Sequence, residues 1–342
     1  MATNHMLSDQ LNHPLIIKGK SISPKIVLAP LAGLGHVAMR QLISEYGGFG
    51  LLFTGMCSAK ALPHENRDVS LVFRWRDEEL PYLVCQIFGS EPRSMAMAAR
   101  RIENEGFFGV DLNFGCSVAG ICKKGAGAAL LKDPALCSAI VSRVRQTVSL
   151  PLFVKFRTGW KNDAQFAVDM ARRFEDAGAD ALTFHPRVAP DRRNRPPRWE
   201  QIQLVQQAVD IPVFGNGNLY EPKDGLRMFE QTGCLGLSVG RMAVARPWLF
   251  AQWSCNFEPD NTLFYKTAKR YLTLLSQYYD DFFALKFFKK FLPYFCANFK
   301  FGHQMLKKLA SSQNLISADE NLDVVFELAP DILDRPNQNL FL

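Results

Sequence analysis

The feature that most constrains the fold is a short motif in which a glycine ends a helical segment and an apolar strand follows at once. It occurs at residues 105–112, 177–183 and 232–238, with a looser fourth copy at residues 46–52. Glycine readily adopts the left-handed conformation past a helix end, so the chain can turn directly into a buried strand. A repeated helix–glycine–strand unit predicts helices alternating with parallel strands.

A second motif, a proline directly before an apolar strand, begins at Pro81, Pro151 and Pro212. Proline is tolerated at the first residue of a strand and rarely deeper in a sheet. Together the two motifs predict eight strands, near residues 26–29, 51–54, 82–86, 109–112, 152–155, 181–185, 212–215 and 236–239. Helices are predicted at residues 36–46, 92–105, 134–147, 163–177, 199–209 and 222–231, whereas residues 57–80 show no clear helix.

Eight strands alternating with helices predict an α/β fold, a (β/α)8 TIM barrel. An open doubly wound sheet is the alternative, but residues 31–35 lack the full glycine spacing that such a sheet carries after its first strand.

Composition changes after Trp253: residues 262–314 have helical spacing dense in Phe and Tyr, and residues 282–318 contain no Asp or Glu. We therefore predict a catalytic barrel over residues 1–254 and a helical domain over residues 255–342.

Within the helical domain, Lys286, Lys289 and Lys290 are three and four residues apart and share one helix face. Pro293 is expected to break or cap a helix. The sequence from residue 314 onward is polar and rich in Asp, which predicts a loosely attached tail.

The net charge of +7 over 342 residues permits a polyanionic partner without requiring one. Eight cysteines form no CxxC pair and no Cys/His set with zinc spacing, and scattered single cysteines suggest a reducing compartment. Residues 1–14 lack the pattern of a secretory signal, and no apolar run is long enough to cross a bilayer. We expect a soluble, cytoplasmic monomer with neither a metal nor a membrane partner.

Polar side chains stand where several predicted strands end. Asn113 and Cys116 follow the fourth strand, ahead of a small-residue stretch at 123–131. Gln86, Lys155 and His185 stand at the ends of three other strands, and Arg157 lies two residues beyond Lys155. Barrel enzymes keep their chemistry at the carboxyl ends of the strands. A free cysteine is more often a small buried hydrophobe, but several polar groups facing one mouth favour a functional site.

The loops after the seventh and eighth strands, residues 215–218 and Gly240-Arg241, are where barrels usually bind phosphate. Gly217 lets the backbone approach a ligand, and Arg241 can neutralise a phosphate. Tight turns without a ligand are the alternative. This pair of loops predicts a phosphorylated cofactor or substrate.

The motifs taken together resemble the tRNA-dihydrouridine synthases. They are Ala29-Pro30-Leu31-Ala32-Gly33, Gln86-Ile87-Phe88-Gly89, Asp111-Leu112-Asn113-Phe114-Gly115-Cys116, Gly125-Ala126-Gly127-Ala128-Ala129-Leu130-Leu131, Val154-Lys155-Phe156-Arg157-Thr158-Gly159-Trp160, His185-Pro186-Arg187, Gly215-Asn216-Gly217-Asn218 and Gly240-Arg241. The match runs in order from about residue 24 to 250, with a helical domain after it. The resemblance implies an FMN-binding barrel, a tRNA-binding helical domain, and reduction of the C5–C6 double bond of tRNA uridines to 5,6-dihydrouridine, with NADPH reducing the FMN.

By the same resemblance, Cys116 is the general acid, and Asn113, Arg157 and Arg187 face the uracil. The residues implied for FMN are Pro30, Leu31, Ala32, Gln86, Lys155, His185, Asn216, Gly217, Asn218, Gly240 and Arg241. A thiol has a pKa suited to giving the proton that completes the reduction. The target uridine is expected to leave its stack, with Lys286, Lys289 and Lys290 on the RNA phosphates.

Three residues depart from the family pattern: Ser117 stands where a proline is usual, Pro186 where a glycine is usual, and Asn218 where an acid is usual. They affect loop shape and the phosphate contacts rather than a reacting group.

Two other functions stay open from the sequence. One is an FMN barrel acting on a free pyrimidine, like a dihydroorotate dehydrogenase, which the acid-free helical region disfavours. The other is a non-catalytic RNA-binding protein, which the presence of Cys116, Lys155 and His185 together disfavours.

Overall fold

The computed structural model of the chain describes residues 2–191 and 195–341. Eight parallel strands form its centre, at the positions that the sequence predicts. They are β3 (Ile26–Leu28), β4 (Leu52–Phe53), β6 (Leu83–Phe88), β7 (Gly109–Phe114), β8 (Leu152–Gly159), β9 (Ala181–Val188), β10 (Val213–Asn216) and β11 (Gly236–Val239). Their order is β3-β11-β10-β9-β8-β7-β6-β4, and a bridge between Val27 and Leu51 joins the two ends of this row. The predicted TIM barrel is confirmed.

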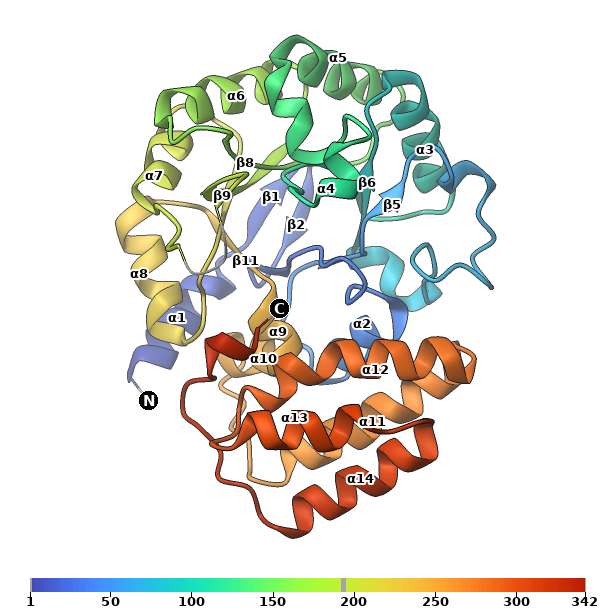
Figure 1. The fold of residues 1–342 in the computed structure, drawn as a ribbon. Coiled ribbons are helices and arrows are strands. Elements are labelled where there is room, and N and C mark those ends of the chain that lie inside the picture. The colour runs from blue at the N-terminus through green and yellow to red at the C-terminus, as the bar shows by residue number, and fades with distance from the viewer. Residues whose placement is uncertain (1, 192–194, 342) are drawn as a thin grey trace.

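Helices surround the strands in a ring (Figure 1). They are α2 (Val37–Tyr46), α3 (Pro92–Asn104), α5 (Pro134–Arg145), α6 (Ala164–Asp176), α7 (Glu200–Gln207) and α8 (Pro222–Thr232). The glycine motif has the predicted geometry, since Gly106, Gly178 and Gly233 have φ angles of 82°, 100° and 64°. A side chain at these positions would be strained, so glycine allows each helix to end directly before a strand.

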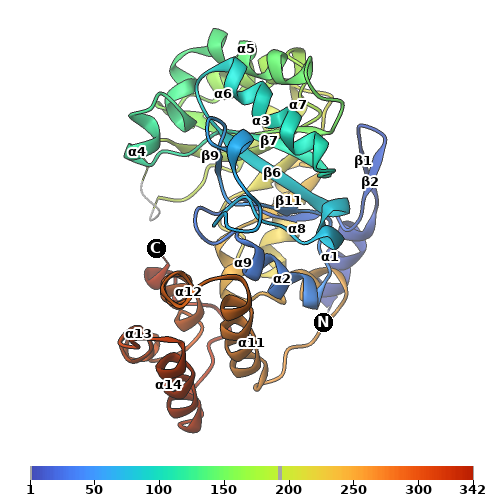
Figure 2. The ribbon, with the colours of Figure 1, turned by 90° about the vertical axis from the view of Figure 1, so that its right-hand side faces the viewer.

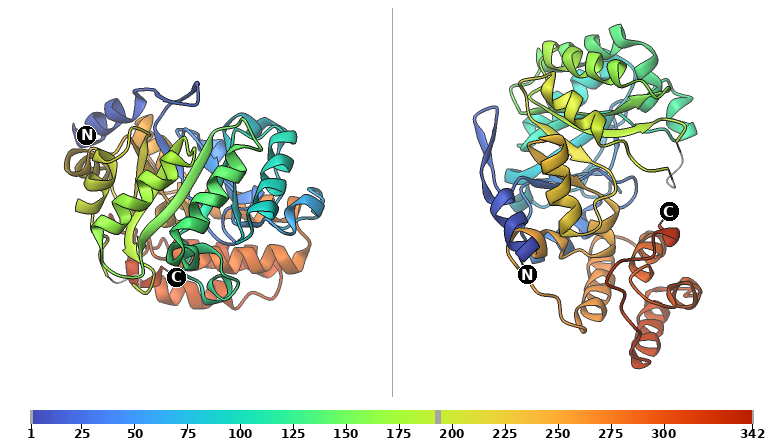
Figure 3. Two further views of the ribbon diagram at one scale, coloured as in Figure 1. Left: turned by 90° about the horizontal axis from the view of Figure 1, so that it is seen from above. Right: turned by 90° about the vertical axis from the view of Figure 1, so that its left-hand side faces the viewer.

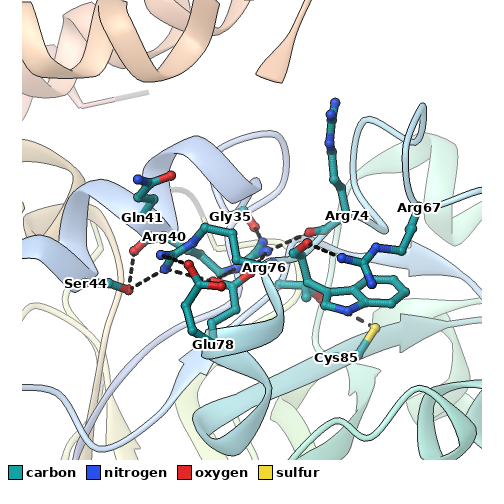
Figure 4. A network of polar contacts seen from close by, with 12 residues as sticks. Gly35, Arg40, Gln41, Ser44, Arg67, Arg74, Arg76, Glu78 and Cys85 are labelled. Atoms are coloured by element: carbon teal, nitrogen blue, oxygen red, sulfur yellow. Dashed lines mark hydrogen bonds and ion pairs between the residues drawn. The ribbon is translucent and has the colours of Figure 1, made fainter. Parts of the chain in front are cut away.

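The link from β4 to β6 has no α-helix, in agreement with its irregular sequence. It contains β5 (Cys57–Ser58) and two short 3-10 helices, η1 (Leu62–His64) and η2 (Asp77–Tyr82). Arg40 on α2 holds this link through a fully buried ion pair with Glu79, at 2.6 Å. The same guanidinium donates to the carbonyl oxygens of Gly35 and Arg74, at 2.6 and 2.7 Å (Figure 4). One buried cation therefore ties α2 to two loops, and removing either partner would leave an uncompensated charge.

The N-terminal segment is structured, which the sequence reading did not predict. α1 (Ala2–Asn12) is a helix, and β1 (Leu15–Ile17) and β2 (Lys20–Ile22) form an antiparallel hairpin. Leu7 and Leu11 on α1 are fully buried, and α1 packs on α8 and α10 (Leu249–Ser254), beside the N-terminus in Figure 3. Its apolar face is so narrow that the segment looks polar by composition.

The hairpin closes the amino end of the barrel. Ile17 and Ile22, each at most 2% exposed, pack in one apolar cluster with strand residues that include Phe53, Phe153 and Phe214. This end of the barrel is therefore filled by hydrocarbon. The opposite end, where the strands finish, carries the polar residues.

The C-terminal helices stack on one side of the barrel (Figure 2). They are α11 (Leu263–Tyr278), α12 (Asp281–Cys296), α13 (Gly302–Ala310) and α14 (Leu315–Glu327). α11 packs on α2, and α12 packs on α9 (Arg241–Ala245), which follows β11. The division into domains at residues 254 and 255 stays a prediction. Among the described residues, no helix is both long and apolar enough to cross a bilayer.

Two expectations for this region are wrong. Pro293 lies inside α12, which continues to Cys296. A proline removes one hydrogen bond, the one from its own N–H to the carbonyl oxygen four residues earlier, at Lys289, and α12 continues without that bond. The tail is not loosely attached: α14 is a helix capped by Asn314, which accepts a hydrogen bond from the Ser317 N–H at 2.8 Å. Further on, Phe341 is only 6% exposed.

Candidate active site

A cavity of about 430 Å³ opens at the carboxyl ends of the strands. All the predicted cofactor residues except Gln86 line it: Pro30, Leu31, Ala32, Lys155, His185, Asn216, Gly217, Asn218, Gly240 and Arg241. Arg157, Arg187 and Lys290 line it too. The volume is within the usual range for small-molecule sites. Residues that are far apart in the sequence, from Pro30 to Lys290, thus surround one cavity.

Gln86, Asn113 and Cys116 lie outside this wall, in the neighbouring sector of the barrel. Asn113 is opposite Lys155 in the β7–β8 register. The Asn113 Nδ2 donates to Gln86 Oε1 at 2.8 Å, and the Cys116 N–H donates to Asn113 Oδ1 at 2.9 Å. Burial lowers the pKa of Arg157, and the neighbouring Cys116 acts in the opposite direction. The partly exposed thiol of Cys116 therefore adjoins the cavity at its Lys155 and Arg157 side.

The cavity is strongly cationic. Lys155, Arg157, Arg187 and Arg241 face it, whereas its described lining includes no Asp or Glu. Burial, and then the nearby Arg241, lower the pKa of Arg187 to about 10. Burial, followed by the charges of these cations, lowers the pKa of His185 well below its usual value, so its imidazole is neutral. Such a field favours an anionic ligand.

Lys155 lies on β8 and lines the cavity. Burial lowers its pKa to about 8, with Arg157 acting the same way and Asp111 opposing. Its Nζ lies 3.5 Å from Asn216 Oδ1, a long hydrogen bond. At pH 7 the Lys155 ammonium is therefore still mostly charged, and its long bond to a neutral amide offsets little of that charge. The ammonium is thus suited to stabilise negative charge on a bound group.

Two buried polar atoms in the wall have no partner within the described part of the chain, His185 Nε2 and Ser238 Oγ. Buried polar atoms rarely stay unpaired, and at a cavity they point to a ligand. A side chain at Gly217 would meet the imidazole, since its Cβ would lie 3.1 Å from His185 Cδ2. These features fit a group with a phosphate and a polar ring, as FMN has. In residues 2–191 and 195–341, no three His, Cys, Asp or Glu side chains gather as a metal ion requires.

The side-chain oxygen of Asn218 accepts hydrogen bonds from three donors. This Oδ1 atom accepts from Arg187 Nη2 at 3.2 Å, Tyr220 Oη at 3.0 Å and Arg241 Nη2 at 3.4 Å. Because the amide is neutral, it orients Arg241 without cancelling its charge. That charge stays available to an anionic ligand.

The three lysines of α12 do not behave alike. Lys290 Nζ donates to the Ala32 carbonyl oxygen at 2.7 Å and lines the cavity. Lys286 is exposed, and Lys289 is half-buried. Lys290 therefore belongs to the barrel mouth, whereas the other two remain candidates for RNA contact.

Sequence reasoning missed four residues near the site: Asp111, Tyr220, Tyr294 and Phe341. Tyr220 and Tyr294 line the cavity, and Phe341 stacks on Tyr220 at 6.3 Å and lies 5.5 Å from the ring of Tyr294. Only Asp111 carried a usable signal, because it precedes Asn113 by two residues and so shares its strand face. The aromatic contacts join distant segments and leave no local pattern.

The fold and the site define a class: a (β/α)8-barrel protein with a cationic ligand cavity at the carboxyl ends of its strands. Solved structures of this architecture are similar in fold. A 2-naphthoyl-CoA reductase complex matches 73% of this chain and 52% of its own, with a TM-score of 0.56 and 14% identity. A variant of NCR from Zymomonas mobilis matches 73% of this chain and 92% of its own, with a TM-score of 0.53 and 15% identity.

Sequence comparison identifies the family. The profile described as "Dihydrouridine synthase (Dus)" matches residues 27–328. The "Probable tRNA-dihydrouridine synthase 1" of Synechocystis sp. is 35% identical over 70% of this chain and 67% of its own. The "tRNA-dihydrouridine synthase B" of Pseudomonas aeruginosa is 36% identical over 67% and 68%, and a "Probable tRNA-dihydrouridine synthase" of Mycobacterium tuberculosis is 32% identical over 88% and 82%. The chain belongs to the dihydrouridine synthase family, a family of oxidoreductases.

Proposed function

We propose that the protein reduces the C5–C6 double bond of uridines in tRNA to 5,6-dihydrouridine, using FMN as the hydride donor and NADPH as the reductant. The observation that carries the proposal is a cationic cavity whose described lining includes no acidic residue, beside Cys116, in a chain of the dihydrouridine synthase family. An anionic flavin and an anionic RNA both suit that charge.

The chain offers distinct groups for each part of FMN. Arg241 is the cation for the phosphate, and Gly217 and Gly240 leave its loops open to close approach. Lys155 and His185 Nε2, which has no partner among the described residues, are our candidates for contact with the ring. When bound, FMN supplies a hydride to C6 of the uracil.

Cys116 supplies the proton that completes the reduction. As C6 gains the hydride, the electron pair of the C5–C6 bond moves to C5, which takes the proton from Sγ, and the thiolate later regains a proton from solvent. Asn113 holds the Cys116 loop by accepting its backbone N–H. Arg157, which interacts electrostatically with Cys116, stabilises the thiolate left behind.

The uridine must leave its base stack to reach this site. Lys286 and Lys289 on α12 are our candidates for binding RNA phosphates beside the mouth, and Lys290 holds the rim at Ala32. Phosphate contacts of this kind give an affinity that falls with salt. Lys289→Glu should therefore weaken RNA binding several-fold and flatten the salt dependence, with the flavin content unchanged.

The test is to map dihydrouridine in RNA from cells with and without this protein, and then to repeat the reaction with purified protein, unmodified tRNA, and NADPH or NADH. We expect yellow protein and uridine sites that are reduced only when it is present. Yellow protein that reduces a free pyrimidine but no RNA would favour the dihydroorotate dehydrogenase-like alternative. Colourless protein that binds RNA would favour a non-catalytic role.

A further inference from the structure

A chain of side-chain hydrogen bonds runs through the polar layer of the barrel and ends at Asp111, a residue without a role so far. Asp111 lies on β7 and is fully buried. Its Oδ2 accepts from Gln86 Nε2 at 2.5 Å, and Gln86 Oε1 accepts from Asn113 Nδ2 at 2.8 Å. Asn113 Oδ1 in turn accepts from the backbone N–H groups of Gly115 and Cys116, at 3.1 and 2.9 Å.

The loop end fixes the direction of every bond in this chain. Backbone N–H groups only donate, so Asn113 must turn its oxygen toward Cys116 and its NH2 group toward Gln86. Gln86 must then present its oxygen to Asn113 and its NH2 group to Asp111. Each amide has one accepting end and one donating end, so the chain has one consistent order. That order requires an acceptor at its far end.

We propose that Asp111 is a positioning residue: its oxygen sets the amide orientations of Gln86 and Asn113 and thereby holds the loop that carries Cys116. Without this acceptor, Gln86 Nε2 is buried and unpaired. If Gln86 turns over instead, its NH2 group meets the NH2 group of Asn113, which must turn over too and lose Cys116. Either outcome disfavours the present loop position.

The backbone supports this chain of contacts. Gln86 and Asp111 are opposite each other in the β6–β7 register, and Asn113 is on the same strand face as Asp111. The backbone N–H of Gln86 donates to Thr54 Oγ1 at 3.0 Å. Burial raises the pKa of Asp111 to about 7, with the Gln86 bond and then Lys155 opposing. A protonated carboxyl group keeps one carbonyl oxygen, so the chain persists through that titration.

The experiment compares Asp111→Leu with Asp111→Asn in the flavin-loaded, full-length protein. Asparagine offers an oxygen at the same place and preserves the chain, whereas leucine of similar size offers none. The first readout is the rate at which iodoacetamide alkylates Cys116, followed on its peptide by mass spectrometry, and the second is kcat. We expect Asp111→Asn to stay within about twofold of the natural protein and Asp111→Leu to change both quantities by about tenfold.

Two results overturn the proposal: Asp111→Leu with unchanged Cys116 alkylation, or Asp111→Asn as impaired as Asp111→Leu, which would assign the effect to charge. If Asp111→Leu does not fold, Gln86→Met breaks the same series of hydrogen bonds while Asp111 keeps its carboxyl group, and unchanged alkylation there overturns the proposal equally. Thr183→Val is the matched control, because Thr183 is buried on β9 and takes no part in the hydrogen bonds between Asp111, Gln86 and Asn113.

The catalytic consequence rests on the proposed function, but the alkylation readout does not. A protein that forms no dihydrouridine yet shows the expected alkylation pattern contradicts the proposed function alone. A protein that forms dihydrouridine with an alkylation rate insensitive to Asp111→Leu contradicts the positioning role alone.

Discussion

The two ends of the barrel are built from the same strands but differ in polarity and in charge. At the closed end, Phe53, Phe153 and Phe214 pack against the hairpin, and each is at most 2% exposed. At the open end, Lys155 and His185 are surrounded by further cations, and His185 Nε2 has no partner within the described residues. On β8 the change takes two residues, from Phe153 to Lys155. The barrel thus separates the apolar part that stabilises the fold from the candidate binding site.

This division has an energetic reason. Burying a large apolar side chain stabilises a fold by about 1.5–3 kcal/mol. Burying a cation opposes folding, as the pKa of Lys155, lowered by burial to about 8, records. The stability that the apolar closed end provides can therefore offset the free-energy cost of burying cations at the open end. Functional sites often hold such destabilising groups.

The largest expected effect is on chemistry at the open end. Cys116→Ala should lower kcat by about 10²–10⁴-fold, because general acid catalysis is typically worth that much. Single-turnover dihydrouridine formation measures the loss, and thermal unfolding and flavin absorbance should not change. Cys255→Ala, at an exposed cysteine, is the control. Full activity in Cys116→Ala would remove the general-acid role.

A comparable effect on stability is expected at the closed end. Phe153→Ala leaves a cavity in the apolar cluster and should lower the free energy of unfolding by about 3–5 kcal/mol. Urea unfolding measures this change. Val69→Ala, at a side chain that is 74% exposed, should change it by less than about 0.5 kcal/mol. If both variants are equally stable, the closed end does not carry the stability that we assign to it.

The third prediction separates the two ends on one strand. Lys155→Met removes a buried charge and keeps the length of the side chain, so the free energy of unfolding should fall by less than about 1 kcal/mol or rise. Flavin affinity should fall by about tenfold or more, measured by fluorescence titration, because a charged hydrogen bond is lost. A loss of stability as large as that of Phe153→Ala would contradict the division.

The smallest expected effect is a sensitivity to acid at the rim of the open end. His36 lies beneath the helical domain, with its Nε2 3.0 Å from Tyr271 Oη and its ring 4.3 Å from that of Phe287. Burial, and then Arg40 and Lys290, lower its pKa to about 3. The folded protein keeps a neutral ring while the unfolded chain gains a proton below about pH 6.5. Stability from this group is complete above pH 6.5 and is lost as the pH falls toward 3.

Between pH 7 and 5.5, the natural protein should therefore lose about 1 kcal/mol more unfolding free energy than His36→Gln, which keeps an acceptor for Tyr271 but does not titrate. Urea unfolding at the two pH values measures the difference. Equal losses in both proteins would show that the rim is as insensitive to acid as the apolar closed end.

Local patterns in the sequence determined the barrel and most of the cavity. The glycines that end α3, α6 and α8 and the prolines before strands depend only on neighbouring residues, so they locate the elements. Once the strands are located, their carboxyl ends meet at one mouth, which brings Lys155, His185 and Arg241 together. The aromatic spacing likewise predicted the helical region after residue 262.

Only the tertiary structure decided which side chains touch. Lys290 reaches the Ala32 carbonyl across 258 positions of the chain, and Phe341 packs on Tyr220. The bond between Gln86 and Asp111 depends on the register of two strands. Register, closure of the barrel and packing of the helical bundle result from contacts among all the elements at once. Periodicity and turn residues act within about one element, so they do not specify these contacts.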